Sequence, residues 1–189
     1  MSNGRTTIAG DLTNISYVTL ALIGDGGASP QDLVDMNRRG GQIYYSVAAS
    51  RQYAEPKRLE GLGYVRSEKR PGRTRERSFY TLTPKGREAL RSWVLEPPTL
   101  PRIQNDAVPK LMAGDIADDD PALLETLLTL RPALDAQKAT LAEGRRRLDD
   151  LAHRRTYLLL VHELGERLID AQRAWLDEVE RELGRTDEP

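Results

Sequence analysis

The last long segment of the chain limits the fold more than any other. Apolar side chains recur there at alternating spacings of four and three residues, at Tyr157, Val161, Leu164, Leu168, Ala171 and Trp175. This heptad stripe predicts one long helix over about residues 151–183. Such a helix is about 45 Å long, which is too long for the rest of the chain to cover both of its sides.

The partner of this stripe can be the same chain or a second copy. The intramolecular candidate is the preceding segment, where three aspartates before Pro121 predict the start of a helix. Its leucines at positions 127, 134, 141 and 148 lie seven residues apart, with Pro132 and Gly144 as expected weak points or kinks. We expect a mixture, in which one side of the last helix packs within the chain and the other forms a homodimer. The predicted dimerisation residues are Tyr157, Val161, Leu164, Leu168 and Trp175.

The first half of the chain begins with two shorter helical patterns. Residues 14–25 are mainly apolar, with Asn14 or Ser16 as the expected cap and glycines at the end. A second helix is predicted to begin at Ser29, which is a good cap, and Pro30, which is tolerated in a first turn. Both helices are therefore short and bounded by glycine-containing turns.

A third helix is expected over about residues 47–62. Tyr53, Leu59 and Leu62 fit an inward-facing stripe along it. Pro56 removes a backbone hydrogen bond from this helix and is expected to kink it. The period then changes, because β-type residues flank a Pro-Gly turn and predict a two-stranded hairpin. A fourth helix opens at Thr83-Pro84, and a proline-rich linker follows it.

The order helix, helix, helix, hairpin, helix is that of a winged helix-turn-helix, whose third helix is expected in the major groove of DNA. The predicted fold class is mainly α with a small β-hairpin wing. We place a winged helix-turn-helix DNA-binding domain over residues 1–100 and a helical, coiled-coil-like dimerisation domain over residues 101–189. Residues 1–95 carry a net charge of +6 and the remainder −7, which predicts a polyanionic partner for the first half alone.

The predicted DNA contacts come from the third helix and the wing. Arg and Gln have the donors and acceptors that base edges need, whereas Ser, Tyr and Lys suit phosphates. The candidates on the helix are Ser50, Arg51, Gln52, Tyr53, Lys57 and Arg58, and those in the wing are Lys69, Arg70, Arg73, Arg75 and Arg77. Two simpler interpretations stay open, because a basic hairpin is often only a solvated surface and Tyr53 could equally be a core residue.

The sequence lacks the residue patterns that enzyme or metal chemistry requires. It has no cysteine, and its two histidines lie nine residues apart, not at the i, i+4 spacing of a helical metal site. We therefore expect no enzyme activity, no catalytic residue, no metal and no cofactor. The apolar runs are too short to cross a bilayer, and the first residues do not resemble a secretory signal. These features predict a cytoplasmic protein without a membrane partner.

Several motifs over residues 15–96 resemble the PadR family of bacterial transcriptional regulators. The matching residues are Tyr53, Lys57, Arg58, Leu59, Glu60, Gly63, Tyr80, Leu82, Thr83 and Gly86. The chain departs from the pattern at Ala54 and Pro56, which leaves the base contacts open. The second half is similar to the branch with a virulence-activator-type helical C-terminal domain.

The resemblance implies a homodimer, built on C-terminal helices, that binds a palindromic operator in double-stranded DNA. Family members commonly act as repressors, and some release DNA when a small aromatic or drug-like ligand binds. Trp93 and Trp175 are the candidate ligand-binding residues. The alternative hypothesis is a protein-interaction or small-molecule-sensing module without specific DNA binding.

Overall fold

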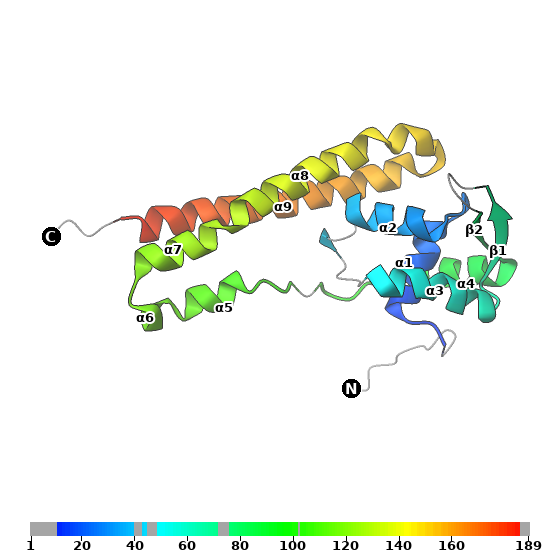
Figure 1. The fold of residues 1–189 in the computed structure, drawn as a ribbon, viewed down its shortest axis with the longest axis horizontal. Helices are drawn as coiled ribbons and strands as arrows, with labels where there is room; N and C mark the ends of the chain where they lie inside the picture. Colours follow the sequence, from blue (N-terminus) through cyan, green and yellow to red (C-terminus); the bar gives the residue numbers. More distant parts are fainter. Residues whose placement is uncertain (1–10, 40–42, 45–48, 72–75, 102, 186–189) are drawn as a thin grey trace. The chain divides into compact units, whose positions relative to one another are not determined.

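The structure is a computed structural model that describes residues 11–39, 43–44, 49–71, 76–101 and 103–185. The chain divides into two compact units, unit 1 (Met1–Thr99) and unit 2 (Leu100–Pro189) (Figure 1). Helices dominate both units, and the named strands of the described chain form a single hairpin in unit 1. The predicted fold class is therefore confirmed.

Unit 1 has the predicted order of elements. Its helices are α1 (Asn14–Ile23), α2 (Pro30–Arg39), α3 (Ala49–Gly61) and α4 (Pro84–Val94), and its strands are β1 (Val65–Arg70) and β2 (Arg77–Leu82). The strands pair antiparallel, with Val65 opposite Leu82. The backbone groups of Ala28 and Tyr80 also exchange hydrogen bonds of 3.0 and 2.8 Å, which attaches the loop after α1 to the hairpin.

One apolar cluster holds the elements of unit 1 together. Leu20 of α1, Leu33 of α2 and Leu59 of α3 are at most 2% exposed. The ring of Tyr17 stacks on Trp93 of α4, with 4.9 Å between the ring centroids. Burial of one such aliphatic side chain stabilises the folded state by about 1.5–3 kcal/mol, so this cluster fixes where α3 lies.

The two first helices begin with reciprocal side-chain caps. The N-cap of α1 is Thr13, not Asn14, and Thr13 and Ser16 each accept a hydrogen bond from the other's backbone amide. The predicted caps Asn14 and Ser16 were therefore wrong, although the Ser16 side chain completes the capping box from the third helical position. At α2 the expected cap Ser29 is confirmed, and its amide donates to the Asp32 carboxylate over 2.8 Å.

Close packing attaches α4 to the start of the hairpin. The Thr83 hydroxyl accepts from the Gly86 amide and donates to the Gly63 carbonyl over 2.7 Å. A Cβ on Gly86 would lie 1.9 Å from the Tyr64 carbonyl oxygen. Glycine is required at position 86 because no other residue allows this approach.

The inward face of α3 differs from the expected stripe. Pro56 and Leu59 are buried, whereas Tyr53 is 47% exposed, so neither the inward stripe nor the core interpretation of Tyr53 is right. At about 100° per residue, Tyr53 lies about 120° around the helix from Leu59, which is enough to leave the core. The helix continues through Pro56 to Gly61, and Leu62 packs against the core beyond its end.

Unit 2 is helical throughout its named elements. These are α5 (Ala107–Met112), α6 (Gly114–Ala117), α7 (Asp120–Leu128), α8 (Leu130–Arg146), a 3-10 helix η2 (Leu148–Arg154) and α9 (Arg155–Leu183). A weak point in the helix was expected at Pro132, but the structure has the break earlier, at Thr129, between α7 and α8. Pro132 occupies the first turn of α8, where the missing N–H has no helical partner to lose.

α8 and α9 form an antiparallel hairpin with an apolar centre (Figure 1). The four regularly spaced leucines, at positions 127, 134, 141 and 148, are all buried, as are Ile169, Leu176 and Val179 of α9. Ion pairs between the two helices flank this centre. As the residue number rises along α8 it falls along α9, as expected for an antiparallel pair: Arg131–Asp177, Asp135–Arg173, Lys138–Asp170 and Arg145–Glu166. Exposed pairs contribute at most about 1 kcal/mol each, so the buried aliphatic side chains dominate.

Candidate nucleic-acid interface

The outer side of α3 presents polar and basic side chains to solvent. Arg51 and Lys57 are exposed, and neither has a hydrogen-bond or ion-pair partner among the described residues. The Tyr53 hydroxyl donates to the Gln31 side chain of α2 over 3.1 Å. The N–H and O–H groups of these side chains are of the kind that donates hydrogen bonds to phosphates and to the edges of bases.

Four of the predicted contact residues cannot be placed in full. Ser50 and Gln52 lie within α3, but their side chains fall outside the described residues. Arg73 and Arg75 belong to residues 72–75, which follow β1 in the sequence and lie outside the described residues. Their roles stay predictions.

Arg58 donates hydrogen bonds to three other residues of unit 1. Its Nε and one terminal nitrogen donate to the two carboxylate oxygens of Glu55, over 3.0 and 2.8 Å. The same terminal nitrogen reaches the buried Ser16 hydroxyl of α1 over 2.8 Å, and the other donates to the Asp11 carbonyl over 3.0 Å. The predicted DNA contact Arg58 therefore joins α3 to α1 and to the segment before it.

Glu55 completes this network from the other side. Its carboxylate accepts from the Ser16 hydroxyl over 2.8 Å as well as from Arg58. Burial raises the pKa of Glu55, but the hydrogen bonds from Arg58 and Ser16 and the Arg58 charge outweigh it, so the pKa lies below its ordinary value. Asp11 also accepts from the Tyr64 hydroxyl, and burial, followed by this hydrogen bond, raises the pKa of Tyr64.

A second contact joins α3 to the wing. The Glu60 carboxylate accepts from both the amide and the hydroxyl of Ser67 in β1, over 3.0 and 2.6 Å. The sequence prediction missed the positioning roles of Glu55 and Glu60. The spacing of Glu55 and Arg58, three residues apart on a helix, was the one available signal for the first pair. No sequence pattern places Glu60 beside Ser67.

The wing has an exposed basic surface that is partly held by its own neighbours. The Arg70 guanidinium lies 3.5 Å from the centroid of the Phe79 ring and donates to Glu68 over 2.5 Å. Lys69 donates to Ser78 across the strands over 3.3 Å. Arg77 lies 3.8 Å from Asp32, which connects β2 to α2. Arg70, Lys69 and Arg77 remain exposed, so their charges face solvent.

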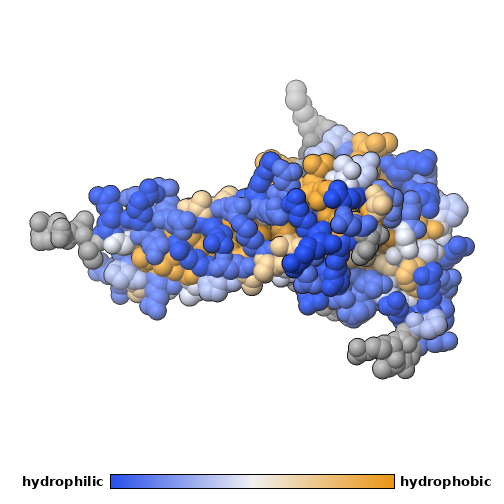
Figure 2. All heavy atoms as spheres, turned by 90° about the horizontal axis from the view of Figure 1, so that it is seen from above, coloured by the Kyte–Doolittle hydropathy of each residue, from blue (hydrophilic) through white to orange (hydrophobic). Residues whose placement is uncertain are grey.

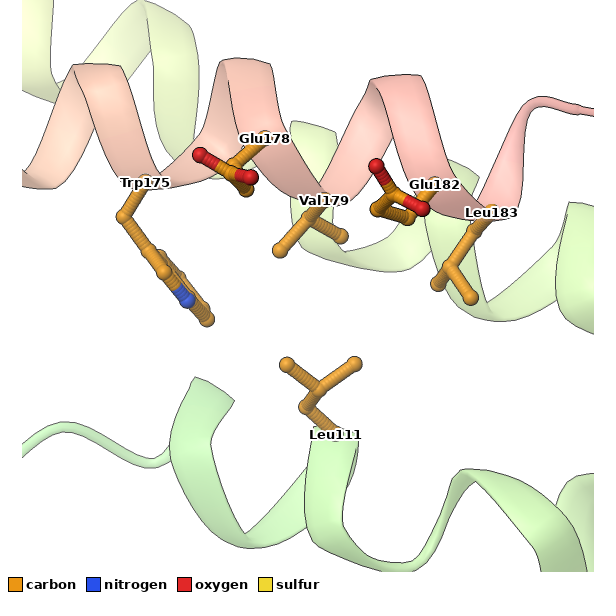
Figure 3. A pocket seen from close by; sticks show the side chains of 6 residues that line it. All are labelled: Leu111, Trp175, Glu178, Val179, Glu182 and Leu183. Carbon is orange, nitrogen blue, oxygen red and sulfur yellow. The ribbon is translucent and has the colours of Figure 1, made fainter.

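The predicted dimerisation residues of α9 divide into two groups. Tyr157, Val161 and Leu164 are 72%, 45% and 51% exposed, whereas Leu168 and Trp175 are half-buried. Trp175 lines a groove of about 220 Å³ with Leu111, Val179 and Leu183, and two glutamates lie at its edge (Figure 3). On the face shown in Figure 2, hydrophobic residues (orange) likewise lie exposed between hydrophilic ones (blue) along unit 2.

The two candidate ligand-binding tryptophans have different surroundings. Trp93 is stacked on Tyr17 and packs against the core of unit 1, whereas Trp175 borders the groove of unit 2. Over the described part of the chain, no three acidic, histidine or cysteine side chains are grouped to hold a metal ion. No described helix has the length and apolar character needed to cross a membrane.

Known structures share this arrangement of elements. No model of a known protein family matches the sequence, and no curated protein matches it. The PadR-like transcriptional regulator BC1756 from Bacillus cereus superposes with a TM-score of 0.74, at 16% identity, over 93% of this chain and 97% of that chain. The chain has the PadR-like fold.

Two further PadR-like structures match over nearly their whole lengths. Bacillus subtilis PadR in complex with operator DNA gives a TM-score of 0.67, at 20% identity, over 93% of this chain and 99% of that one. The virulence activator AphA from Vibrio cholerae gives 0.66, at 20% identity, over 90% and 98%. B. subtilis PadR in complex with p-coumaric acid matches less closely, with a TM-score of 0.55 at 20% identity over 88% and 98%.

Proposed function

We propose that this chain is a cytoplasmic, DNA-binding transcriptional repressor that binds an inverted-repeat operator as a homodimer. The observation that carries the proposal is the environment of α3. Its inner side is attached to α1 through Arg58 and to the wing through Glu60, while its outer side presents Arg51 and Lys57 to solvent. A helix held in this way can enter a major groove about 12 Å wide without shifting. B. subtilis PadR, which has the same fold, is known in complex with operator DNA.

The proposed contacts divide into those that read sequence and those that supply affinity. Arg51 and Gln52 contact base edges, and Ser50, Tyr53 and Lys57 contact phosphates. The wing contributes phosphate contacts from Lys69, Arg70, Arg73, Arg75 and Arg77, which makes binding strongly salt-dependent. Because four of its five N–H donors already have partners within unit 1, Arg58 has a positioning role in this proposal.

A homodimer would give the operator two-fold symmetry. The exposed apolar stripe of α9 supports the proposal, because large exposed apolar patches commonly mark interfaces. Two winged domains related by a two-fold axis require half-sites separated by one or two turns of DNA, each about 34–36 Å. Occupancy of such a site would block access of RNA polymerase.

A small aromatic ligand is proposed to release the DNA. B. subtilis PadR is known in complex with p-coumaric acid, which is an aromatic acid. Trp93 and Trp175 are the candidate ligand contacts in this chain, in units 1 and 2 respectively. Titration of tryptophan fluorescence with aromatic ligands, repeated with Trp93→Phe and Trp175→Phe, assigns the response to one of them.

The experiment that tests DNA binding is a mobility shift with the chain's own upstream region. It is run at two salt concentrations with excess nonspecific competitor. We expect a shift that resists competitor and weakens with salt, followed by a footprint with two half-sites. A folded, dimeric chain that gives no shift even at low salt would overturn the proposal. It would favour instead a protein-interaction or small-molecule-sensing module.

A further inference from the structure

The exposed phenol of Tyr53 on α3 belongs to a chain of hydrogen bonds that begins on α2. The Tyr53 hydroxyl lies 3.1 Å from the amide oxygen of Gln31, and the Gln31 amide nitrogen lies 3.3 Å from a carboxylate oxygen of Asp35. Gln31 is exposed in the first turn of α2, and Asp35 follows it one turn later. A residue of the proposed interface is thus bonded to a helix that carries none of the proposed contacts.

The direction of these hydrogen bonds is fixed by the carboxylate. A carboxylate accepts hydrogen bonds and has none to donate, so the amide nitrogen of Gln31 must be the atom that faces Asp35. The amide oxygen then faces Tyr53, and because this oxygen can only accept, the phenol must donate its single hydrogen to it. Toward any further group, the phenol oxygen can therefore only accept.

A phosphate is a poor partner for a phenol held in this way. Phosphate oxygens accept hydrogen bonds, as the phenol oxygen does, so neither group has a hydrogen for the other. The carboxylate of Asp35 adds a like charge nearby, which is offset by an ion pair of 3.5 Å with Arg38 on the same helix. The major groove does offer donors to an acceptor, namely the N6 amino group of adenine and the N4 amino group of cytosine.

The position of Tyr53 on α3 suits a contact with a base edge. At about 100° per residue, Tyr53 lies about 40° around the helix from Lys57 and one turn before it. Both side chains are exposed, while Pro56 and Leu59 face the core. A tyrosine has only two rotatable bonds in its side chain, so a hydroxyl that is held from α2 keeps its oxygen in nearly one place.

We propose that Gln31 and Asp35 are positioning residues that determine specificity, because they make Tyr53 an acceptor for the amino group of an adenine or a cytosine. The inference rests on the DNA binding proposed above and changes one of its contacts, since Tyr53 moves from a phosphate to a base edge. Guanine and thymine present acceptors in the major groove, which would face the phenol oxygen without a hydrogen between them. The preference is therefore for adenine or cytosine on the strand that faces α3.

Removal of single groups from the protein and from the DNA tests the contact. Affinities of the native protein and of Tyr53→Phe are measured for every single-base variant of the footprinted operator. Purine then replaces the selected adenine, or 2-pyrimidinone the selected cytosine, so that the base loses its amino group. The native protein should lose about 2- to 10-fold in affinity, which is what one hydrogen bond contributes. Tyr53→Phe should bind the intact operator more weakly by the same factor and lose nothing further from the altered base.

Two substitutions of Gln31 separate positioning from a merely structural role. Gln31→Leu removes the acceptor, so the phenol has its hydrogen free to donate, and the preference at that position should shift toward guanine or thymine. Gln31→Glu has nearly the same size and keeps an acceptor opposite the phenol. It should retain the preference for adenine or cytosine, while its charge weakens binding to all duplexes alike. Because Gln31 is exposed, thermal unfolding should show that both variants are folded.

The outcomes distinguish this inference from the proposed function. A native protein that binds no duplex specifically would end both. Specific binding in which Tyr53→Phe changes the preference at no position of the operator would leave the proposed function in place and overturn the base contact. Equal base preferences of Gln31→Leu and Gln31→Glu would overturn the positioning role. A preference for adenine or cytosine that is lost in Tyr53→Phe, reversed in Gln31→Leu and retained in Gln31→Glu would support the inference.

Discussion

The two units of this chain differ in how far their polar and apolar side chains find partners within the same unit. In unit 1, Arg58, Glu55 and Ser16 bind one another across helices, and the apolar cluster around Leu20 and Leu59 is closed. In unit 2, one side of α9 is buried on α8, while the other side leaves Tyr157 and its apolar neighbours exposed. Unit 1 therefore buries its apolar cluster within one chain, whereas unit 2 leaves large apolar side chains of α9 exposed.

The largest effects should come from truncating side chains that are buried in one chain. Leu59→Ala in unit 1 and Ile169→Ala in unit 2 remove fully buried aliphatic groups. Each should lower the free energy of unfolding by about 2–5 kcal/mol. Leu164→Ala, at a half-exposed position, should instead leave the stability of the monomer nearly unchanged and raise the dissociation constant of the proposed homodimer. Denaturant unfolding at two protein concentrations distinguishes the two responses, and a large loss from Leu164→Ala in the monomer would contradict the division.

A glycine substitution tests how closely unit 1 is packed. Gly86→Ala places a Cβ against the Tyr64 carbonyl oxygen and should cost about 1–3 kcal/mol of stability. Gly61→Ala is the matched control, because nothing lies within 4 Å of the added atom. That variant should be neutral or stabilising by up to about 1 kcal/mol, since alanine is the better helix former. Thermal unfolding of both variants checks the contrast, and equal losses would show that the contact at Tyr64 is relieved without cost.

The Glu55 network should give unit 1 a pH dependence. Glu55→Gln removes a charged acceptor from Arg58 and Ser16 and should lower stability at neutral pH by about 1.5–3 kcal/mol. Because the folded pKa of Glu55 is lowered, its contribution is present above the unfolded pKa and is lost as the pH falls through the folded pKa. The difference between native and variant proteins should therefore shrink in acid. A difference that stays constant from neutral to acid pH would rule out ionised Glu55 as the cause.

The smallest effects on stability are expected at the exposed side of α3. Arg51→Ala and Lys57→Ala should change the free energy of unfolding by less than about 0.5 kcal/mol. In DNA binding, Arg51→Ala should alter sequence preference and cost about 1–3 kcal/mol, whereas Lys57→Ala should weaken all sequences alike. Binding assays with operator and scrambled duplexes make the comparison. Equal loss on both duplexes from both variants would end the proposed division between base and phosphate contacts.

Local signals in the sequence predicted the elements well, because caps and turns depend on neighbouring residues. Ser29 and Thr83 open their helices as expected, and the two predicted strands pair as β1 and β2. The sequence prediction placed a weak point at Pro132, whereas the break lies at Thr129. A proline in the first turn of a helix does not interrupt that helix. The order of elements was thus sufficient to predict a winged helix, and the solved PadR-like structures confirm it as a fold.

The candidate site was harder to predict, because its contacts join distant parts of the chain. The charge of Arg58 predicted a DNA contact, which stays a prediction, but gave no sign of its contacts with Ser16 and Asp11, which lie more than forty residues earlier. Tyr53 was placed on an inward stripe because periodicity alone does not fix how α3 is rotated against the core. On α9 the stripe identified the apolar residues, but only packing on α8 showed which of them stay exposed.

The contacts of Arg58 also bear on the thermodynamics of DNA recognition. They hold α3 in place before any duplex is present, so the proposed complex requires little loss of backbone freedom in the reading helix. Ordering a mobile side chain on binding costs about 0.5–1.5 kcal/mol, and contacts from a prearranged surface avoid part of that cost. The heat-capacity change of binding should then correspond to the surface buried between protein and DNA, without the additional contribution that accompanies coupled folding.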